Sequence, residues 1–324
     1  MQTSFLTAGL KGKTLRCERF LNEMKRVVPW EQLAQVIAPH YPRGVGGRPS
    51  QPLVRMLKIH CLQQWFALSD PAAEEAIYDR ASFQRFLELD LLSEAVPDET
   101  TILHFRHLLE RHQLAEGLFE RIGEHLAQQG VQVQSGRLVD ATLIAAASST
   151  KNQTRRRDPE MSSTKKGNQW YFGMKAHISV DAQSGLVTRV QTSTAKVHDK
   201  QMIDSLLTGE ESALIADKGY YDQGQKKAAR EKGLFWGVLD RAVRGQSLSG
   251  KQAARNRQLA SVRAKVEHPF QVLKCQWGYV KARYRGLAKN TGQLHLLFGL
   301  INLYRLRHRL LAARENTAAA PASA

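Results

Sequence analysis

The stretch GRLVDATLIAAAS, residues 136–148, decides the fold because the sequence changes its pattern there. It is short, rich in apolar and β-branched side chains and begins at a glycine, which is typical of a β-strand. Two further runs of aromatic and β-branched residues follow in QWYFGMKAHISVDAQSGLVTRVQTST, residues 169–194. The turn-forming segment DAQSG (181–185) separates them, so this stretch predicts a β-hairpin.

Helices and strands alternate after the hairpin. HDKQMIDSLLTG (198–209) predicts a helix, and SALIADKGY (212–220) predicts an apolar strand that ends at Asp217. Residues 223–232 predict a helix and LFWGVLD (234–240) a strand. This order predicts an α/β fold with a mixed β-sheet flanked by helices, whose first and fourth strands lie side by side at the centre. Ligand sites in such sheets form beyond the carboxyl ends of strands.

The first 130 residues have a helical pattern. Apolar residues recur at spacings of three and four over 20–37, 53–66, 71–77, 83–87 and 100–128. Asp70 before Pro71, and Asp98 before Glu99, are typical of helix starts. YPRGVGGRPSQP (41–52) predicts a loop. Short helices in a basic protein fit a helix-turn-helix DNA reader, and a plain helical bundle for packing or dimerisation fits them as well.

The remaining segments complete the predicted organisation. Residues 241–256 are polar and basic, which predicts a loop or insertion, and 258–308 are helical in pattern with interruptions at Pro269 and Gly278. We therefore predict an all-α N-terminal domain over 1–130 for DNA-end binding and/or dimerisation. An α/β domain over 131–310, with a basic insertion near 241–256, and a disordered tail over 311–324 follow it.

Composition points to a nucleic-acid partner. The chain has 324 residues, 42% of them hydrophobic, and a net charge of +17, which attracts polyanions. Its three cysteines are far apart and form neither a disulfide framework nor a zinc spacing. The N-terminus does not resemble a signal peptide, and the apolar stretch near 294–303 is too short to span a bilayer. These features predict a cytoplasmic protein with no membrane partner.

Two aspartates lie where a buried strand meets a possible metal site. Asp140 lies inside the apolar run Leu-Val-Asp-Ala-Thr, and a charge buried in a strand needs a partner or a metal. Asp217 ends the strand ALIAD before Lys218 and Gly219. Taken alone, a solvent-facing Asp140 and an ordinary turn aspartate at 217 explain the two residues at least as well.

Glu267 is the most informative acid. It is the only acidic residue between Asp240 and Glu315, a stretch that holds sixteen Lys and Arg. An ion pair with Arg263, four residues earlier, would be worth only ~0.5 kcal/mol. A carboxylate that holds a cation against DNA explains the position better. Two divalent ions held by carboxylates are a common device for phosphoryl transfer on DNA, and Mg²⁺ prefers such oxygen ligands.

Two basic clusters flank these acids and predict DNA contacts. The first mixes basic side chains with the aromatic run Trp170, Tyr171 and Phe172, as nucleic-acid surfaces do, although such aromatics also form strand cores. The second surrounds QWGYVKARYRGLAK (276–289), in which alternating charges suit phosphate contacts. The predicted DNA-binding residues are Arg155, Arg156, Arg157, Lys165, Lys166, Lys175, Arg263, Lys274, Lys281, Arg283 and Arg285.

These residues together resemble a known family. Arg263, Glu267 and Lys274 have the spacing Arg, three residues, Glu, six residues, Lys, which is the signature of DDE transposases of the bacterial insertion-sequence family five and its relatives. The segments around 138–161, 165–186 and 212–220 also resemble that family, as do PWEQLAQVIAPHYP (29–42) and DETTILHFRHLLERH (98–112). The likeness covers almost the whole chain. One position departs from it, because relatives carry a Tyr where this chain has Ala260.

The resemblance implies a ribonuclease-H-like catalytic domain with Asp140, Asp217 and Glu267 as catalytic residues and metal ligands. It implies two Mg²⁺ ions, with Mn²⁺ as a substitute, no small-molecule cofactor, and double-stranded DNA, both terminal inverted repeats and target, as partner. It also implies a homo-oligomer that acts on paired DNA ends at the bacterial nucleoid. The rival hypotheses are a catalytically inactive, transposase-derived DNA-binding regulator, a general nuclease of the same fold, and a tyrosine or serine recombinase.

Overall fold

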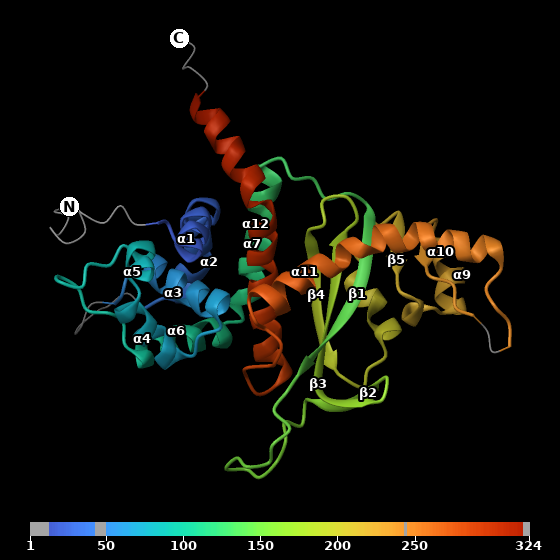
Figure 1. The fold of residues 1–324 in the computed structure, drawn as a ribbon, viewed down its shortest axis with the longest axis horizontal. Coiled ribbons are helices and arrows are strands. Elements are labelled where there is room, and N and C mark those ends of the chain that lie inside the picture. Colours follow the sequence, from blue (N-terminus) through green and yellow to red (C-terminus); the bar gives the residue numbers. More distant parts are fainter. Residues whose placement is uncertain (1–12, 43–49, 243–244, 320–324) are drawn as a thin grey trace.

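The computed structural model describes residues 13–42, 50–242 and 245–319. The N-terminal helices lie on one side of the molecule and the β-sheet on the other, with α7 and α12 between them (Figure 1). Parts of the predicted loop 41–52 and of the predicted insertion 241–256 lie outside the described residues.

The N-terminal part is helical, as predicted. Its helices are α1 (Arg16–Val27), α2 (Trp30–Ile37), α3 (Leu53–Phe66), α4 (Asp70–Asp79), α5 (Ala81–Leu87), α6 (Glu99–Arg111) and α7 (Leu114–Gln128).

Three details of the predicted helices were wrong. The predicted helix 20–37 is divided at Pro29, which cannot donate a helical hydrogen bond. The predicted helix 100–128 is divided at Gln113, whose φ of 51° is left-handed. The cap of α4 is Ser69, whose hydroxyl accepts from the Ala72 amide, and not Asp70; Asp98 caps α6 as predicted.

A six-stranded mixed sheet forms the second part. Its strands are β1 (Gly136–Ala145), β2 (Ser162–Lys166), β3 (Gln169–Asp181), β4 (Val187–Thr194), β5 (Ala213–Ala216) and β6 (Phe235–Val238). The order is β2-β3-β1-β5-β6, and β4 also pairs with β3. β1 is antiparallel to β3 and parallel to β5, so the predicted central pair is confirmed. The strand β2 was not predicted.

The remaining helices are α8 (Ile203–Leu206), α9 (Gln223–Glu231), α10 (Gly250–Arg263), α11 (Glu267–Gln271) and α12 (Leu287–Ala319). The predicted helix 198–209 is only a 3₁₀ turn followed by the single turn α8. The predicted insertion 241–256 is shorter than expected, because a capping box at Ser249 starts α10.

The C-terminal third also differs in detail from the prediction. Pro269 lies within a continuous helical run from Gly250 to Gln276 and follows its irregular 3₁₀ turn at Ala264–Val266, whereas Gly278, with a φ of 67°, lies in a break before α12. The predicted tail is helical up to Ala319, and 320–324 lie outside the described residues.

One hydrophobic core joins the two parts of the molecule. The larger cluster of buried side chains extends from the N-terminal helices through α12 to β1 and β3. A smaller cluster lies between β1, β5 and β6 and the helices α8 and α9. α12 packs against α1, α7 and β4. Within the described ranges, the helices include none with the length and apolar character that crossing a membrane requires.

Candidate active site

The register between β1 and β5 places Asp140 and Asp217 next to each other. Val139 pairs with Ala216, and both side chains belong to the smaller cluster, on the face of the sheet that α8 and α9 cover. Successive side chains of a strand point to opposite faces. Asp140 and Asp217, one residue further along, therefore share the other face, toward α10 and α11.

Glu267 reaches the same region from the first turn of α11. The link is Arg263, the last residue of α10, which donates to Glu267 Oε1 at 3.0 Å and to Asp140 Oδ2 at 3.5 Å. Asp140 is largely buried, with 17% of its side chain exposed, whereas 62% of the Glu267 side chain is exposed. The structure thus places Asp140 and Glu267 on one guanidinium, with Asp217 at the end of the neighbouring strand β5.

The electrostatics of Asp140 reflect this crowding. Burial raises the pKa of the Asp140 carboxyl to about 6, although Arg263 and a hydrogen bond from the Ala141 amide favour its charged form. The negative charges of Asp217 and Glu267 raise this pKa further. An extra cation would therefore find a partly uncompensated negative centre here.

The chemistry of the three carboxylates suits a divalent cation, and Arg263 holds two of them. Three carboxylates from three elements supply the hard oxygen ligands that Mg²⁺ prefers. In the described part of the chain, no three His, Cys, Asp or Glu side chains are grouped closely enough to hold a metal ion. The guanidinium of Arg263 is the cation that Asp140 and Glu267 share, and its Nε is buried without a partner among the described residues.

Tyr220 is a nearby residue that sequence reasoning did not select. It is buried, and its hydroxyl has no hydrogen-bond partner among the described residues. Burial raises the pKa of Tyr220, and the charges of Asp199, Asp140 and Asp217 raise it further. The only signal in the sequence was its place three residues after Asp217, in a segment that also reads as an ordinary turn.

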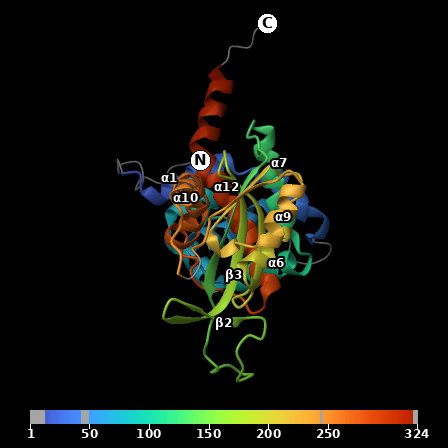
Figure 2. The ribbon, with the colours of Figure 1, turned by 90° about the vertical axis from the view of Figure 1, so that its right-hand side faces the viewer.

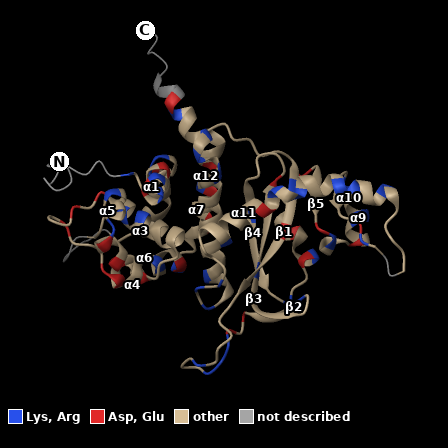
Figure 3. Cartoon of the chain, viewed as in Figure 1, with Lys and Arg blue, Asp and Glu red and all other residues tan. Residues whose placement is uncertain are grey.

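Most of the predicted DNA-binding residues are exposed. Figure 3 shows Lys and Arg along α10 and in the loop 146–161 that follows β1. Arg157 donates to the Ser148 carbonyl, and Arg285 donates to the Thr154 hydroxyl. The exposed members of the predicted set are Arg155, Arg156, Arg157, Lys165, Lys166, Lys281 and Arg285.

Three others have internal partners. Lys175 forms an ion pair with Asp199 at 2.8 Å, and Arg283 donates to the Gln63 carbonyl. Lys274 donates to the Leu143 carbonyl at 2.8 Å, on the edge of β1 that β5 does not cover. Burial lowers the pKa of Lys274, and the charge of Lys166 lowers it further, so Lys166 lies near this edge.

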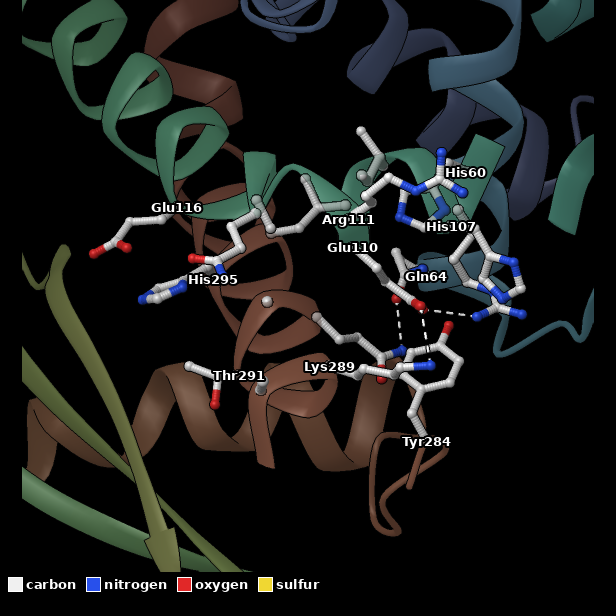
Figure 4. A pocket seen from close by; sticks show the side chains of 18 residues that line it. His60, Gln64, His107, Glu110, Arg111, Glu116, Tyr284, Lys289, Thr291 and His295 are labelled. Atoms are coloured by element: carbon white, nitrogen blue, oxygen red, sulfur yellow. Dashed lines mark hydrogen bonds and ion pairs between the residues drawn. The ribbon is translucent and has the colours of Figure 1, made fainter. Parts of the chain in front are cut away.

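A cavity of about 630 Å³ lies elsewhere, between the N-terminal helices and α12 (Figure 4). Its polar lining includes an ion pair between Lys289 and Glu110 at 3.3 Å, which crosses from α12 to α6. Among the described residues that line it, none is one of the three acids. The cavity belongs to the seam between the two parts and not to the carboxylate centre. Figure 4 labels these residues of its lining: His60, Gln64, His107, Glu110, Arg111, Glu116, Tyr284, Lys289, Thr291 and His295.

The strand order defines the class of protein. A mixed sheet with an antiparallel β4-β3-β1 half and a parallel β1-β5-β6 half, flanked by helices, is the ribonuclease-H-like α/β fold that was predicted.

Comparison with known families identifies the chain more specifically than its fold does. The family described as "Transposase DDE domain" matches residues 132–303, just over half of the chain, and "Transposase domain (DUF772)" matches residues 12–108. The chain belongs to the transposase DDE domain family, and it is a DNA transposase. A solved structure of piggyBac transposase in a synaptic complex with hairpin DNA is also similar, with 9% sequence identity and a TM-score of 0.40. That match covers 99% of this chain and 84% of the other, and at this similarity no conclusion rests on it.

Proposed function

We propose that this transposase belongs to the insertion-sequence family five group and catalyses metal-dependent phosphoryl transfer. In this proposal it binds terminal inverted repeats, hydrolyses the phosphodiester at the element ends and transfers the 3′-hydroxyl ends into target DNA. The observation that carries the proposal is that Arg263 pairs with both Asp140 and Glu267, while Asp217 directly follows Ala216, the partner of Val139 on the neighbouring strand.

These three carboxylates would hold two Mg²⁺ ions, or Mn²⁺ in their place. Bound ions of this kind lower the pKa of an attacking water and stabilise the leaving oxygen. Asp140 and Asp217 are fixed by the register of the central strands, so they supply the rigid half of the site. Glu267 has 62% of its side chain exposed, so its side chain is the one of the three with most room to adjust.

Arg263 has a distinct role in this proposal. Its guanidinium forms ion pairs with both Asp140 and Glu267 in the protein alone. When other cations bind these acids, the guanidinium is free to contact a DNA phosphate, for which its planar set of donors is well suited. The same residue would thus serve both states of the site.

The exposed basic residues would hold the DNA backbone next to this centre. Contacts of Lys and Arg with phosphates are independent of sequence, so affinity should fall steeply with salt. Lys274 would act by supporting the edge of β1 beyond its pairing with β5, where its ammonium already donates to the Leu143 carbonyl.

The organisation of the chain remains part of the proposal. We assign end binding, dimerisation or both to the helical domain over 1–130, and catalysis to 131–310. The proposal also includes action as a homo-oligomer on paired ends at the bacterial nucleoid.

Cleavage of DNA that carries the ends of the element tests the proposal. With Mg²⁺ we expect cuts at the ends and joining to a second DNA, and with EDTA we expect binding alone. A catalytically inactive regulator, which the ion pairs of Arg263 with two of the acids would favour, would bind without cutting in either condition. Cutting that ignores the ends would indicate a general nuclease, and a covalent protein–DNA link after denaturation would indicate a tyrosine or serine recombinase.

A further inference from the structure

Trp170 is exposed in a way that the other tryptophans are not. It lies in the β2–β3 hairpin with 71% of its surface exposed. The other tryptophans, Trp30, Trp65, Trp236 and Trp277, are buried, with 9% or less of their surface exposed. The hairpin and the loop 146–161 project from the same end of the sheet in both views (Figures 1 and 2). An indole in this position contributes little to the core, so its large aromatic surface is open to a partner.

Basic side chains surround this ring on one face of the hairpin. Lys165 is the cross-strand partner of Trp170, and directly opposed residues of an antiparallel pair lie on the same face. Phe172, two residues along β3, shares that face, and the guanidinium of Arg157 lies 5.3 Å from its ring centre. We call the group formed by Arg157, Lys165, Trp170 and Phe172 the hairpin face.

The charge around the hairpin face is positive. Arg155, Arg156 and Lys166 are exposed beside it. The two acids of the neighbouring loop already accept hydrogen bonds from the main chain. Asp158 accepts from the Gly286 amide and Glu160 from the Leu287 amide, both at 2.6 Å. Both carboxylates are therefore held at the start of α12. A polyanion at the hairpin face would meet mainly the exposed basic side chains.

The hairpin face lies within reach of DNA bound at the carboxylates. Ile178 of β3 pairs with Asp140, and Trp170 lies eight residues away on the same strand. A strand rises about 3.4 Å per residue, which limits the separation along β3 to ~27 Å. This corresponds to at most about eight base pairs of DNA. Gly173 of β3 pairs with both Ala145 and Ser162, so the hairpin begins next to the carboxyl end of β1.

We propose that the hairpin face is a stacking site for an unpaired DNA base, with the Trp170 ring as the platform and Lys165 and Arg157 as contacts for the flanking phosphates. Every base has an aromatic face, so stacking needs no particular sequence. A second copy of this chain, with a net charge of +17, would bring like charge to the same surface. The inference rests on the proposed function in one respect, since it takes DNA as the substrate.

The test uses the full chain and two DNA probes. One is a single-stranded oligothymidylate of about 20 nucleotides, longer than the ~16 nucleotides that a single-strand site spans, and the other is a blunt duplex of equal length. Because Trp170 is the exposed indole, oligothymidylate should quench tryptophan emission in the wild type but not in Trp170→Phe. Trp170→Ala should weaken oligothymidylate binding about tenfold or more and change duplex binding less than about twofold. Trp170→Phe keeps a ring and should retain most of the affinity.

Phe235→Ala is the matched control, because Phe235 is an exposed aromatic (53%) on the distant strand β6. It should leave both affinities unchanged. Unchanged oligothymidylate affinity in Trp170→Ala, with duplex binding intact, would overturn the hairpin inference alone. The same holds if Trp170 emission changes with protein concentration and not with DNA, since a second copy would then cover the ring. Failure of the wild type to bind either DNA at low salt would overturn the proposed function as well.

Discussion

Arg263 donates to Asp140 and to Glu267 from a single guanidinium, and 19% of its side chain is exposed. At the residue scale, this side chain explains how the largely buried carboxylate of Asp140 can lie near the carboxylate of Glu267. Removing Arg263 leaves the Asp140 charge buried without an ion pair, which is costly, whereas Arg263 without Asp140 still pairs with Glu267. The same geometry places a resident cation where a divalent ion is expected to bind.

We expect Arg263→Met to lower the free energy of unfolding by ~3 kcal/mol in EDTA, because Asp140 loses its counter-charge. Mg²⁺ should then raise the melting temperature more in this variant than in the wild type, since no guanidinium competes for the acids. Thermal unfolding with and without Mg²⁺ measures both effects. Arg255→Met is the control, because Arg255 lies on the same helix as Arg263 and pairs with Asp240, which follows β6. An equal Mg²⁺ response in all three proteins would contradict the role of Arg263.

Asp140→Asn should stabilise the protein without metal at pH 7.5. The pKa of Asp140 is about 6 in the folded protein and 3.8 ordinarily, so its favourable contribution is present below pH 3.8 and lost as the pH rises through 6. Asparagine avoids this loss, which amounts to roughly 2–3 kcal/mol. Urea unfolding in EDTA should show the gain at pH 7.5 and little difference near pH 4. A destabilised Asp140→Asn at pH 7.5, with the exposed Asp204→Asn unchanged, would refute this expectation.

The sequence pattern singles out three acids as candidates but does not reveal the partners of the basic residues. Asp140, Asp217 and Glu267 stand out because each interrupts a strongly apolar or basic context. Lys175 and Arg283 were grouped with exposed residues because spacing along a chain does not reveal which neighbours fold against them. Their partners, Asp199 and the Gln63 carbonyl, come from elements far away in the sequence.

At the element scale, two carboxylates anchor the loop 146–161 near its end. Asp158 and Glu160 accept hydrogen bonds from the amides of Gly286 and Leu287, where α12 begins. These amides have no partner within the helix, and negative charge at a helix start is favourable. The anchor holds the basic residues of the loop beside the segment that carries Arg285.

Removing the anchor should loosen the loop. Each capping carboxylate is worth about 1 kcal/mol, so Asp158→Ala with Glu160→Ala should increase loop opening roughly thirtyfold. The rate of limited trypsin cleavage after Lys151 and Arg155 reports the open fraction of the loop. Ser249→Ala removes the cap of α10 instead and should leave this cleavage unchanged. Equal cleavage in the double variant and the wild type would show that the anchor does not restrain the loop.

Elements with a strong local signal were predictable. Strands β1, β3, β4 and β5 carry β-branched or apolar runs, and their order alone indicated the mixed sheet. β2 has the sequence SSTKK, which has no apolar alternation and forms a strand because β3 pairs with it. The division of α6 from α7 depends on a left-handed Gln113, a conformation that the residue type does not announce.

At the scale of the whole molecule, α12 connects the two predicted domains. It packs on α1 and α7 on one side and on β4 on the other, and the core is continuous through it. Buried polar contacts reinforce the connection, for example Gln293 of α12 donating to Gln64 of α3 at 2.8 Å. The helical part and the sheet should therefore unfold together.

Stability should fall on the acid side of neutrality. Burial lowers the pKa of His60 and of His177 from 6.5 to about 4. The unfolded chain takes up these protons first, so stability is complete above pH 6.5 and is lost as the pH falls toward 4. Between pH 7 and 5 the loss should be roughly 2 kcal/mol for each residue.

Urea unfolding of His60→Gln compared with wild type measures one share of this loss. The pH dependence of the variant should be shallower by that share, and that of the exposed His104→Gln should match the wild type. Identical slopes in all three proteins would mean that His60 does not stay neutral in the folded state.

The central claim is that Asp140, Asp217 and Glu267 act together on DNA. The most direct measurement is Mg²⁺-dependent cleavage of end-bearing DNA by Asp140→Asn, Asp217→Asn and Glu267→Gln, with Asp204→Asn as control and DNA affinity measured in parallel. We expect each of the three to lose cleavage by more than about a hundredfold while binding DNA almost normally, and the control to cleave normally. Cleavage at the wild-type rate by any one of the three would contradict the claim.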